Sequence, residues 1–264
     1  MFHRHNFLIC PIHKKGDVQN CENSRGISLV TTVYKVLPTV PYRRLKPHAN
    51  KIIGQYQCGF RGLSTFDQIH TLRQILEKTL EFQIETHHLF IDLKTAYDKV
   101  NRNQLYKAMV ELGIPPKLVR LTQAMMEGTT AKVKIQNELS ESFHILNGLR
   151  QADALACILL NITLEKIICE ANINQRGNIF YKSVQIPAYA DDTDIPAYAD
   201  DTDIPAYADD TDIPAYADDT DIPAYAVAIY IISRSPKSLQ EVTFALDRAA
   251  RMTGLEINQA KTST

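Results

Sequence analysis

The sequence predicts an α+β fold in which a small antiparallel sheet packs on helices. Apolar residues recur at helical spacing in several long segments, and short apolar runs of strand length stand between these segments. The expected order is strand, helices, hairpin, helix, strand–turn–strand, helix and strand, which is typical of the α+β class. With 264 residues, of which 45% are hydrophobic and 22% charged, the composition is that of an ordinary globular protein.

In chain order, the first 60 residues are expected to be irregular, because prolines, glycines and basic residues interrupt them. A helix is then predicted from Ser64 or Thr65, which offer N-caps, through Leu80. A buried strand follows at His87–Leu93. Two further helices are expected at Gln104–Leu112 and from Pro116 to Met126, with Gly113 and prolines between them.

In the second half, alternation of polar and apolar residues predicts a hairpin from Lys132–Asn137 and Ser142–Leu146. A helix is expected to begin at Ser235 and Pro236 and to end at Gly254. The other predicted elements are an apolar helix capped by Asp153, an incoming strand, an apolar return strand and a closing strand. Their ranges are Ala154–Ala171, Ile179–Ile186, Ala228–Ile232 and Leu255–Ile257.

Charge is distributed very unevenly. Residues 186–226 contain 12 Asp and no Lys, Arg or Glu, so the rest of the chain carries 29 basic and 18 acidic side chains. A basic body beside an acidic segment fits a nucleic-acid surface next to a metal site. A mildly basic solvated surface explains the same balance equally well.

Five scattered cysteines, without a C-x-x-C pair or a secretory leader, indicate a reduced intracellular protein, in the nucleus or cytoplasm and not secreted. Cys10, His13 and Cys21 lack a fourth ligand for zinc. The most apolar segment, Leu155–Cys169, is too short and too polar to span a bilayer, so no membrane association is expected.

The tetrapeptide Tyr-Ala-Asp-Asp occurs four times, within nonapeptide repeats, beginning at Tyr189, Tyr198, Tyr207 and Tyr216. Adjacent aspartates at a hairpin tip offer the hard oxygen ligands that Mg²⁺ prefers. A second carboxylate site is Asp92, at the end of a predicted buried strand, where an unpartnered acid is costly. Two structural roles are also open: Asp92 as the cap of the next helix, and Tyr97 as core filler.

The chain resembles the reverse transcriptase domain of non-LTR (LINE-like) retrotransposons over nearly its whole length. Six segments carry this resemblance in the family's order. They are Pro11–Asp17 with Asn23–Leu29, Cys58–Arg61 with Ser64–Ile69, Phe90–Asp98, Gly148–Cys157, the Tyr-Ala-Asp-Asp repeats, and Gly254–Asn258 with Lys261 and Thr262.

The resemblance implies a right-hand polymerase fold with partial fingers at 1–85, a palm at 86–264, a repeat insertion at 186–226 and no thumb. It implies RNA-directed DNA synthesis from dNTPs on an RNA template and a DNA primer. Two Mg²⁺ ions, or Mn²⁺, would assist this reaction. The oligomeric state is left open.

The resemblance also implies roles for individual residues. Asp92 would ligate both ions, joined by Asp191 and Asp192 of the first repeat, and Lys261 would protonate pyrophosphate. Tyr97 matches the position that excludes the ribose 2′-hydroxyl. The other residues implied to contact phosphates, nucleotide or template are Lys14, Lys15, Arg25, Arg150, Gln151 and Tyr189.

Further hypotheses concern the repeats and the function. The palm is expected to fold around the first copy, with the remaining copies as an acidic loop, since long insertions cost little entropy. The return strand at Ala228–Ile232 is preceded by Val227 instead of an acid. Two alternatives to the polymerase are an inactive remnant that keeps the fold and binds nucleic acid, and an Asp-rich array that binds Ca²⁺.

Overall fold

The chain forms two compact units in a computed structural model, and their segments alternate along the sequence. The first comprises Met1–Gly54, Lys94–Asn172 and Ala245–Glu256; the second comprises the remaining segments. The structure describes residues 6–13, 17, 19–29, 37–54, 56, 57, 59, 65–150, 154–173, 229–260 and 262. The predicted strand Ile179–Ile186 and the 186–226 repeats lie outside these residues.

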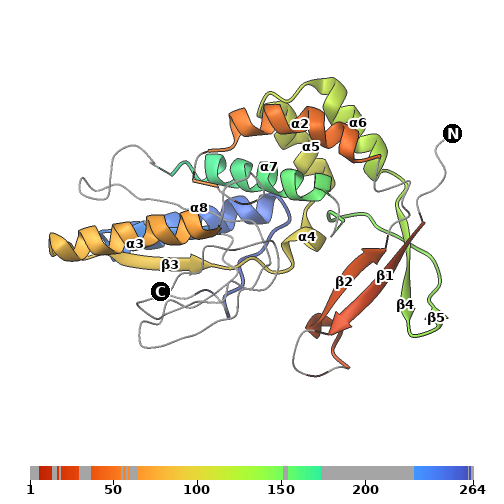
Figure 1. The fold of residues 1–264 in the computed structure, drawn as a ribbon, viewed down its shortest axis with the longest axis horizontal. Coiled ribbons are helices and arrows are strands. Elements are labelled where there is room, and N and C mark those ends of the chain that lie inside the picture. Colours follow the sequence, from red (N-terminus) through yellow and green to blue (C-terminus); the bar gives the residue numbers. More distant parts are fainter. Residues whose placement is uncertain are drawn as a thin grey trace. The chain divides into compact units, whose positions relative to one another are not determined.

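The first unit contains a five-stranded mixed sheet (Figure 1). Strand β1 lies between β2, which is antiparallel to it, and β4, which is parallel to it. Both β5 and β6 pair antiparallel with β4, so the predicted hairpin is confirmed. The strands are β1 (Asn6–His13), β2 (Ser24–Leu29), β4 (Thr130–Ile135), β5 (Glu138–Leu139) and β6 (Phe143–His144), with a 3₁₀ turn at Cys21–Asn23 before β2.

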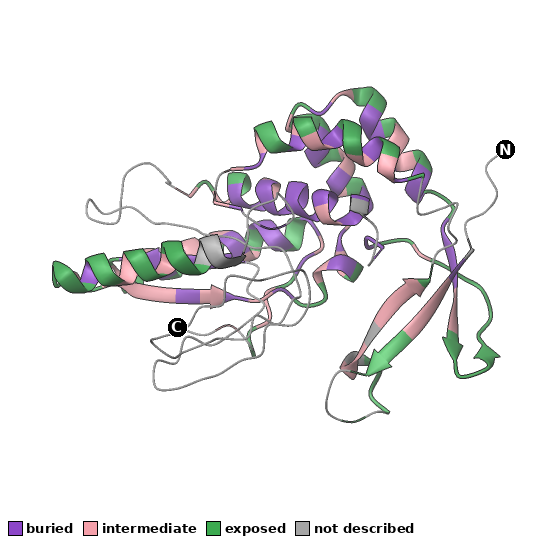
Figure 2. Cartoon of the chain, viewed as in Figure 1, coloured by how far each residue is buried: buried purple, intermediate pink, exposed green. Residues whose placement is uncertain are grey.

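The helices of the first unit are centred on α7. This helix is mainly apolar, with few polar residues such as Asn161 and Glu165, and Figure 2 shows it buried along most of its length. Helices α2, α4 and α5 pack on α7, and α6 packs on α2 and α5. Their bounds are α2 (Thr39–Ile52), α4 (Ala96–Lys99), α5 (Arg102–Glu111), α6 (Pro116–Met126) and α7 (Ala154–Glu170).

The prediction that the first 60 residues are irregular was wrong, since they contain β1, β2 and α2. Two of their prolines sit where they cost little. Pro11 lies beyond the Asn6–Ile9 stretch of β1 that pairs with β4, so its missing N–H breaks no bond on that side. Pro41 lies in the first turn of α2, and burial of Leu45 and Ala49 offsets Pro47 in the helix interior.

The second unit is built on an antiparallel pair of strands, β3 (His87–Ile91) and β7 (Ile229–Ser233), with Phe90 opposite Tyr230. Helix α3 (Thr65–Glu81) covers one face of this pair by packing Leu72 and Ile75 against Tyr230 and Ile232. These elements confirm the predicted helix and the two predicted strands. The predicted closing strand is present only as a bridge between Leu93 and Ile257.

Helix α8 (Pro236–Met252) begins where Ser235 and Pro236 predicted. The chain leaves it through Gly254, which has a φ of +86°. The predicted helices at 104–112 and 116–126 are confirmed as α5 and α6. In the described part of the chain, no helix combines the length and the apolar character that crossing a membrane requires.

A half-buried histidine ties the two strands of the second unit together. The ring nitrogens of His88 hydrogen-bond the Thr86 hydroxyl, at 2.9 Å, and the Tyr230 hydroxyl. The Tyr230 ring also contacts Phe90, with ring centroids 4.4 Å apart. Burial of the His88 ring, helped by the neighbouring His87, lowers the pKa of His88 below its ordinary value of 6.5. Folding therefore favours the neutral ring.

We expect acid to destabilise the protein partly through His88. Below a pH of about 6.5 the unfolded chain binds a proton at this ring more readily than the folded chain, so the free energy of unfolding falls as pH decreases. Urea unfolding from about pH 7 to about pH 5 measures this dependence. His88→Gln keeps hydrogen-bonding groups without titrating and should flatten the slope; an unchanged slope would contradict the assignment.

Candidate active site

The carboxylate of Asp92 lies directly after β3, at the end of a strand whose last residue, Ile91, is completely buried. Asn258 holds it in two ways. The Asn258 side-chain amide donates to Asp92 Oδ2 at 2.8 Å, and the Asn258 backbone N–H donates to the Asp92 carbonyl at 2.8 Å. Because hydrogen bonds to a carboxylate are strong and directional, this pair fixes the orientation of the acid. Asp92 is half-buried.

Asn258 belongs to the predicted Gly254–Asn258 motif, but no contact or role was predicted for its side chain. The motif supplies the strand-like segment that pairs beside Leu93, and this pairing brings the amide to the acid. The sequence feature that could have indicated this role is the polar side chain of Asn258, directly after the predicted closing strand.

The donor chemistry at Asp92 suits a hard divalent cation, because carboxylate oxygens are the ligands that Mg²⁺ prefers. One acid alone does not make a metal site, and within the described residues no three His, Cys, Asp or Glu side chains gather as a possible site. Asp191, Asp192, Tyr189 and Lys261 lie outside those residues. Their convergence on Asp92 stays a prediction.

The first unit brings Tyr97 against the predicted template motif. Tyr97 lies on the short helix α4, its side chain is 8% exposed, and its hydroxyl donates to Cys157 Sγ of α7 at 3.7 Å. Thr95, before α4, has a φ of +41°, which is strained for a β-branched residue. Two segments that the sequence treated as separate motifs, Phe90–Asp98 and Gly148–Cys157, therefore meet at this tyrosine.

Gly148 packs directly on the backbone of α4. Its N–H donates to the Val100 carbonyl at 2.8 Å, and the next N–H, of Leu149, donates to the Tyr97 carbonyl at 2.6 Å. A Cβ on Gly148 would lie 2.6 Å from the Asp98 carbonyl oxygen, and the φ of +83° is itself a glycine conformation. A Cβ on Gly254 would likewise lie 2.7 Å from the Lys99 carbonyl oxygen. Two glycines thus allow α4 to be held between close-packed backbones.

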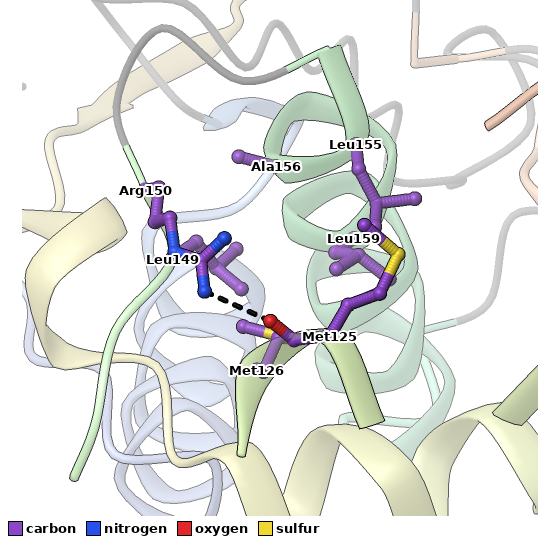
Figure 3. Close-up of a pocket in the computed structure, with 7 residues that line it drawn as sticks. All are labelled: Met125, Met126, Leu149, Arg150, Leu155, Ala156 and Leu159. Carbon is purple, nitrogen blue, oxygen red and sulfur yellow. Dashed lines mark hydrogen bonds between the residues drawn. The ribbon is translucent and has the colours of Figure 1, made fainter. Parts of the chain in front are cut away.

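Arg150 turns inward (Figure 3). Its guanidinium donates to the Met125 carbonyl at 2.8 Å and to the Thr129 hydroxyl at 3.1 Å, and lies 4.2 Å from the centre of the Phe7 ring. The neighbouring cavity, between α6 and α7, measures about 10 Å³, which holds at most one water molecule. In these contacts Arg150 anchors its own loop to the end of α6. The predicted contact with the template stays a prediction.

Arg102 is a second buried arginine, which the sequence did not single out. It is 8% exposed and donates to the carbonyls of Gly148 at 2.9 Å, Met126 at 2.7 Å and Ile145 at 3.0 Å. Burial lowers the pKa of Arg102 from its ordinary value. Its position on the apolar stripe of α5, with Leu105 and Met109 at i+3 and i+7, was a signal that could have revealed it.

The other predicted nucleic-acid contacts are not tested by the structure. Lys14, Lys15 and Gln151 lie outside the described residues. Arg25 lies on β2, opposite Ile12 of β1, and its side chain is not among those described.

Gly148→Ala tests the close packing of α4, with Gly113→Ala as its matched control. Gly113 has nearly the same φ, +82°, but nothing lies within 4 Å of its Cβ position. In both variants the free energy of unfolding should fall by about 1–2 kcal/mol, because alanine is strained in the left-handed backbone conformation. In Gly148→Ala the free energy of unfolding should fall by roughly 2 kcal/mol more, because the α4 backbone must move. Equal losses in urea unfolding would show that the contact is unimportant.

Comparison with known proteins gives the family. The family model described as "Reverse transcriptase (RNA-dependent DNA polymerase)" matches residues 12–206. The transposon TX1 149 kDa protein of Xenopus laevis is 26% identical over 183 residues, covering 68% of this chain and 14% of that protein. A probable RNA-directed DNA polymerase from transposon BS of Drosophila melanogaster is 24% identical over 188 residues, covering 70% of this chain and 20% of the relative.

A third relative is the Pol polyprotein of the type-1 retrotransposable element R2 of Popillia japonica, 21% identical over 188 residues, with 69% of this chain and 26% of the relative covered. The chain thus spans only 14 to 26% of the length of these three proteins.

Among solved structures, apo telomerase from Candida tropicalis has a similar fold, with a TM-score of 0.62 at 12% identity, over 98% of this chain and 50% of that chain. A Candida albicans telomerase bound to a fragment of telomeric RNA gives a TM-score of 0.60 at 10% identity, over 98% of this chain and 41% of that chain. These likenesses support the α+β fingers-and-palm fold. On the match to its model over most of the sequence, this chain belongs to the reverse transcriptase (RNA-dependent DNA polymerase) family.

Proposed function

We propose that this chain is the polymerase part of a non-LTR retrotransposon protein and extends a DNA primer with dNTPs on an RNA template. The family match supports this, and the observation that carries it is Asp92, a carboxylate held in one orientation at the end of a buried strand. The proposal keeps a fingers region at 1–85 and a palm at 86–264. It places the protein inside the cell, in the nucleus or cytoplasm, where RNA and dNTPs meet.

In this proposal Asp92 holds divalent metal together with Asp191 and Asp192, and Asn258 keeps the Asp92 carboxylate oriented. Two Mg²⁺ ions, or Mn²⁺, would supply Lewis-acid stabilisation of the charge that develops on the transferred phosphoryl group. Lys261 would donate a proton to the departing pyrophosphate, and Tyr189 would lie beside the nucleotide.

In this proposal Tyr97 contributes to the choice between dNTPs and ribonucleotides through its shape. Its ring is packed and its hydroxyl is engaged by Cys157, so it forms a wall that cannot readily move aside. A fixed wall of this kind would reject the additional 2′-hydroxyl of a ribonucleotide, because packed side chains do not yield to an extra atom without strain. Lys14, Lys15, Arg25, Arg150 and Gln151 would hold phosphates and template.

The alternatives gain no support from the comparisons. A Ca²⁺-binding array of repeats does not explain a family match that extends from residue 12 to residue 206. An inactive remnant would match the same model, and the measurement of primer extension separates it from an enzyme.

Asp92→Asn tests the proposal most directly. The variant keeps the shape of the side chain and loses its charge, so primer extension on an RNA template should fall about a thousandfold, since metal stabilisation is worth several kcal/mol. Asp247→Asn removes a carboxylate that pairs with Arg251 on α8, and should leave extension within about twofold, as exposed pairs contribute little. Normal extension by Asp92→Asn would refute the assignment.

Asn258→Ala should lower kcat about 10- to 100-fold, the usual loss when a residue that orients a metal ligand is removed. Asn258→Asp should be worse, because it places a second negative charge beside Asp92. KM for dNTP and the urea midpoint should change little in the Ala variant. If kcat stays at the wild-type level in both variants, Asn258 does not orient the acid.

A further inference from the structure

Two neighbouring helices, α2 and α6, carry many cations and no acids. Between them they contain three arginines and three lysines, whereas neither contains an Asp or Glu. The nearest acid in sequence is Glu127, directly after α6. A helix on the surface of a globular protein usually mixes both signs of charge, so this bias needs a cause.

The cations lie on the solvent side of both helices. In α2 the buried residues are Pro41, Leu45 and Ala49, and in α6 the buried stripe runs from Leu118 to Met126. The two helices pack against each other. We call the exposed cations on them the α2–α6 patch, which consists of Arg43, Arg44, Lys51, Lys117 and Arg120.

No described residue forms an ion pair with any member of the patch. Several cations on other helices are paired within their own helix: Arg73 with Glu77 at 2.9 Å, Lys78 with Glu81 at 2.6 Å, and Arg251 with Asp247 at 2.8 Å. Those helices neutralise part of their own charge. The α2–α6 patch instead leaves five like charges on adjacent helices, which costs folding energy and favours an anionic partner.

We propose that the α2–α6 patch binds the phosphate backbone of a double-helical segment of RNA, outside the stretch being copied. This goes beyond the motif residues, none of which lies on α2 or α6, and it rests on the proposed function for the identity of the RNA. Its chemistry is sequence-independent, since lysine and arginine contact phosphates without reading bases.

Two features favour a helical nucleic acid over a single strand or a lipid surface, and the proposed function makes that helix RNA. Single strands are held by aromatic side chains on which bases stack. The aromatic side chains of α2 are Tyr42, which already has the Lys46 ammonium 5.7 Å from its ring centre, and the half-buried His48, and α6 has none. A helix that inserts into a lipid surface needs a wide apolar face beside the cations, and the only large exposed apolar residue of α2 is Val40. With 14 residues, α2 is about 21 Å long and can follow several phosphates.

The test compares two triple variants that remove the same amount of charge. One neutralises the patch, Arg43→Gln, Arg44→Gln and Arg120→Gln. The control neutralises ion-paired cations, Arg73→Gln, Lys78→Gln and Arg251→Gln. Binding of a fluorescent, blunt-ended RNA duplex without a primer terminus is measured by anisotropy over a salt series. The patch variant should bind at least about tenfold more weakly, and its log–log salt slope should shrink by roughly 0.9 for each phosphate that it no longer neutralises.

The control should bind within about twofold of the wild type, because local charge and not net charge sets the interaction with phosphates. The inference is overturned if the wild type does not bind the duplex, if both triple variants lose affinity equally, or if the patch variant keeps its affinity and slope. It is also overturned if single-stranded RNA or phosphatidylserine vesicles displace the duplex from the patch. Primer extension is scored separately, so an enzyme that binds duplex RNA without extending a primer refutes only the proposed function.

Discussion

The contact on which the first unit depends is one between backbones: the loop at Gly148 lies directly on the carbonyls of α4. A side chain fits at this position only if the α4 backbone moves, because its Cβ would lie 2.6 Å from the Asp98 carbonyl oxygen. The close approach lets two amide N–H groups of the loop bond to the Val100 and Tyr97 carbonyls. Leu149 and Arg150 follow Gly148 directly, so this contact helps to fix where they lie.

Two buried arginines also secure this loop. Arg102 and Arg150 donate to the carbonyls at the end of α6, Met126 and Met125, where the helix leaves its own acceptors unsatisfied. A guanidinium carries five donors in a fixed plane, so one side chain can satisfy carbonyls from several segments at once. Arg102 does this for three carbonyls in two segments, the end of α6 and the Ile145–Gly148 stretch. These cations are structural, in contrast to the exposed cations of α2 and α6, which have no described ionic partner.

In the second unit the corresponding constraint is the pairing of β3 with β7. His88, Phe90 and Tyr230 lie on one face of this pair, and a slip by one residue would move Tyr230 to the other face. The register determines where β3 ends and therefore where Asp92 lies. Asn258 then fixes the acid itself, through one bond to the backbone and one to the side chain.

The sequence by itself determined the α+β class, the helices with clear apolar periodicity, such as α3, α6 and α8, and the position of Asp92 at a strand end. Each depends on local patterns: apolar spacing, caps and the cost of a buried acid. The sequence-based prediction failed over the first 60 residues, because prolines argue locally against regular structure. In the folded chain, packing of α2 on α7 and pairing of β1 with β4 outweigh this local effect. Only the tertiary structure decided that Arg150 points inward, that Arg102 is buried, that Asn258 holds Asp92 and that Tyr97 meets Cys157. These contacts join residues 21 to 166 positions apart, and no local pattern encodes such pairings.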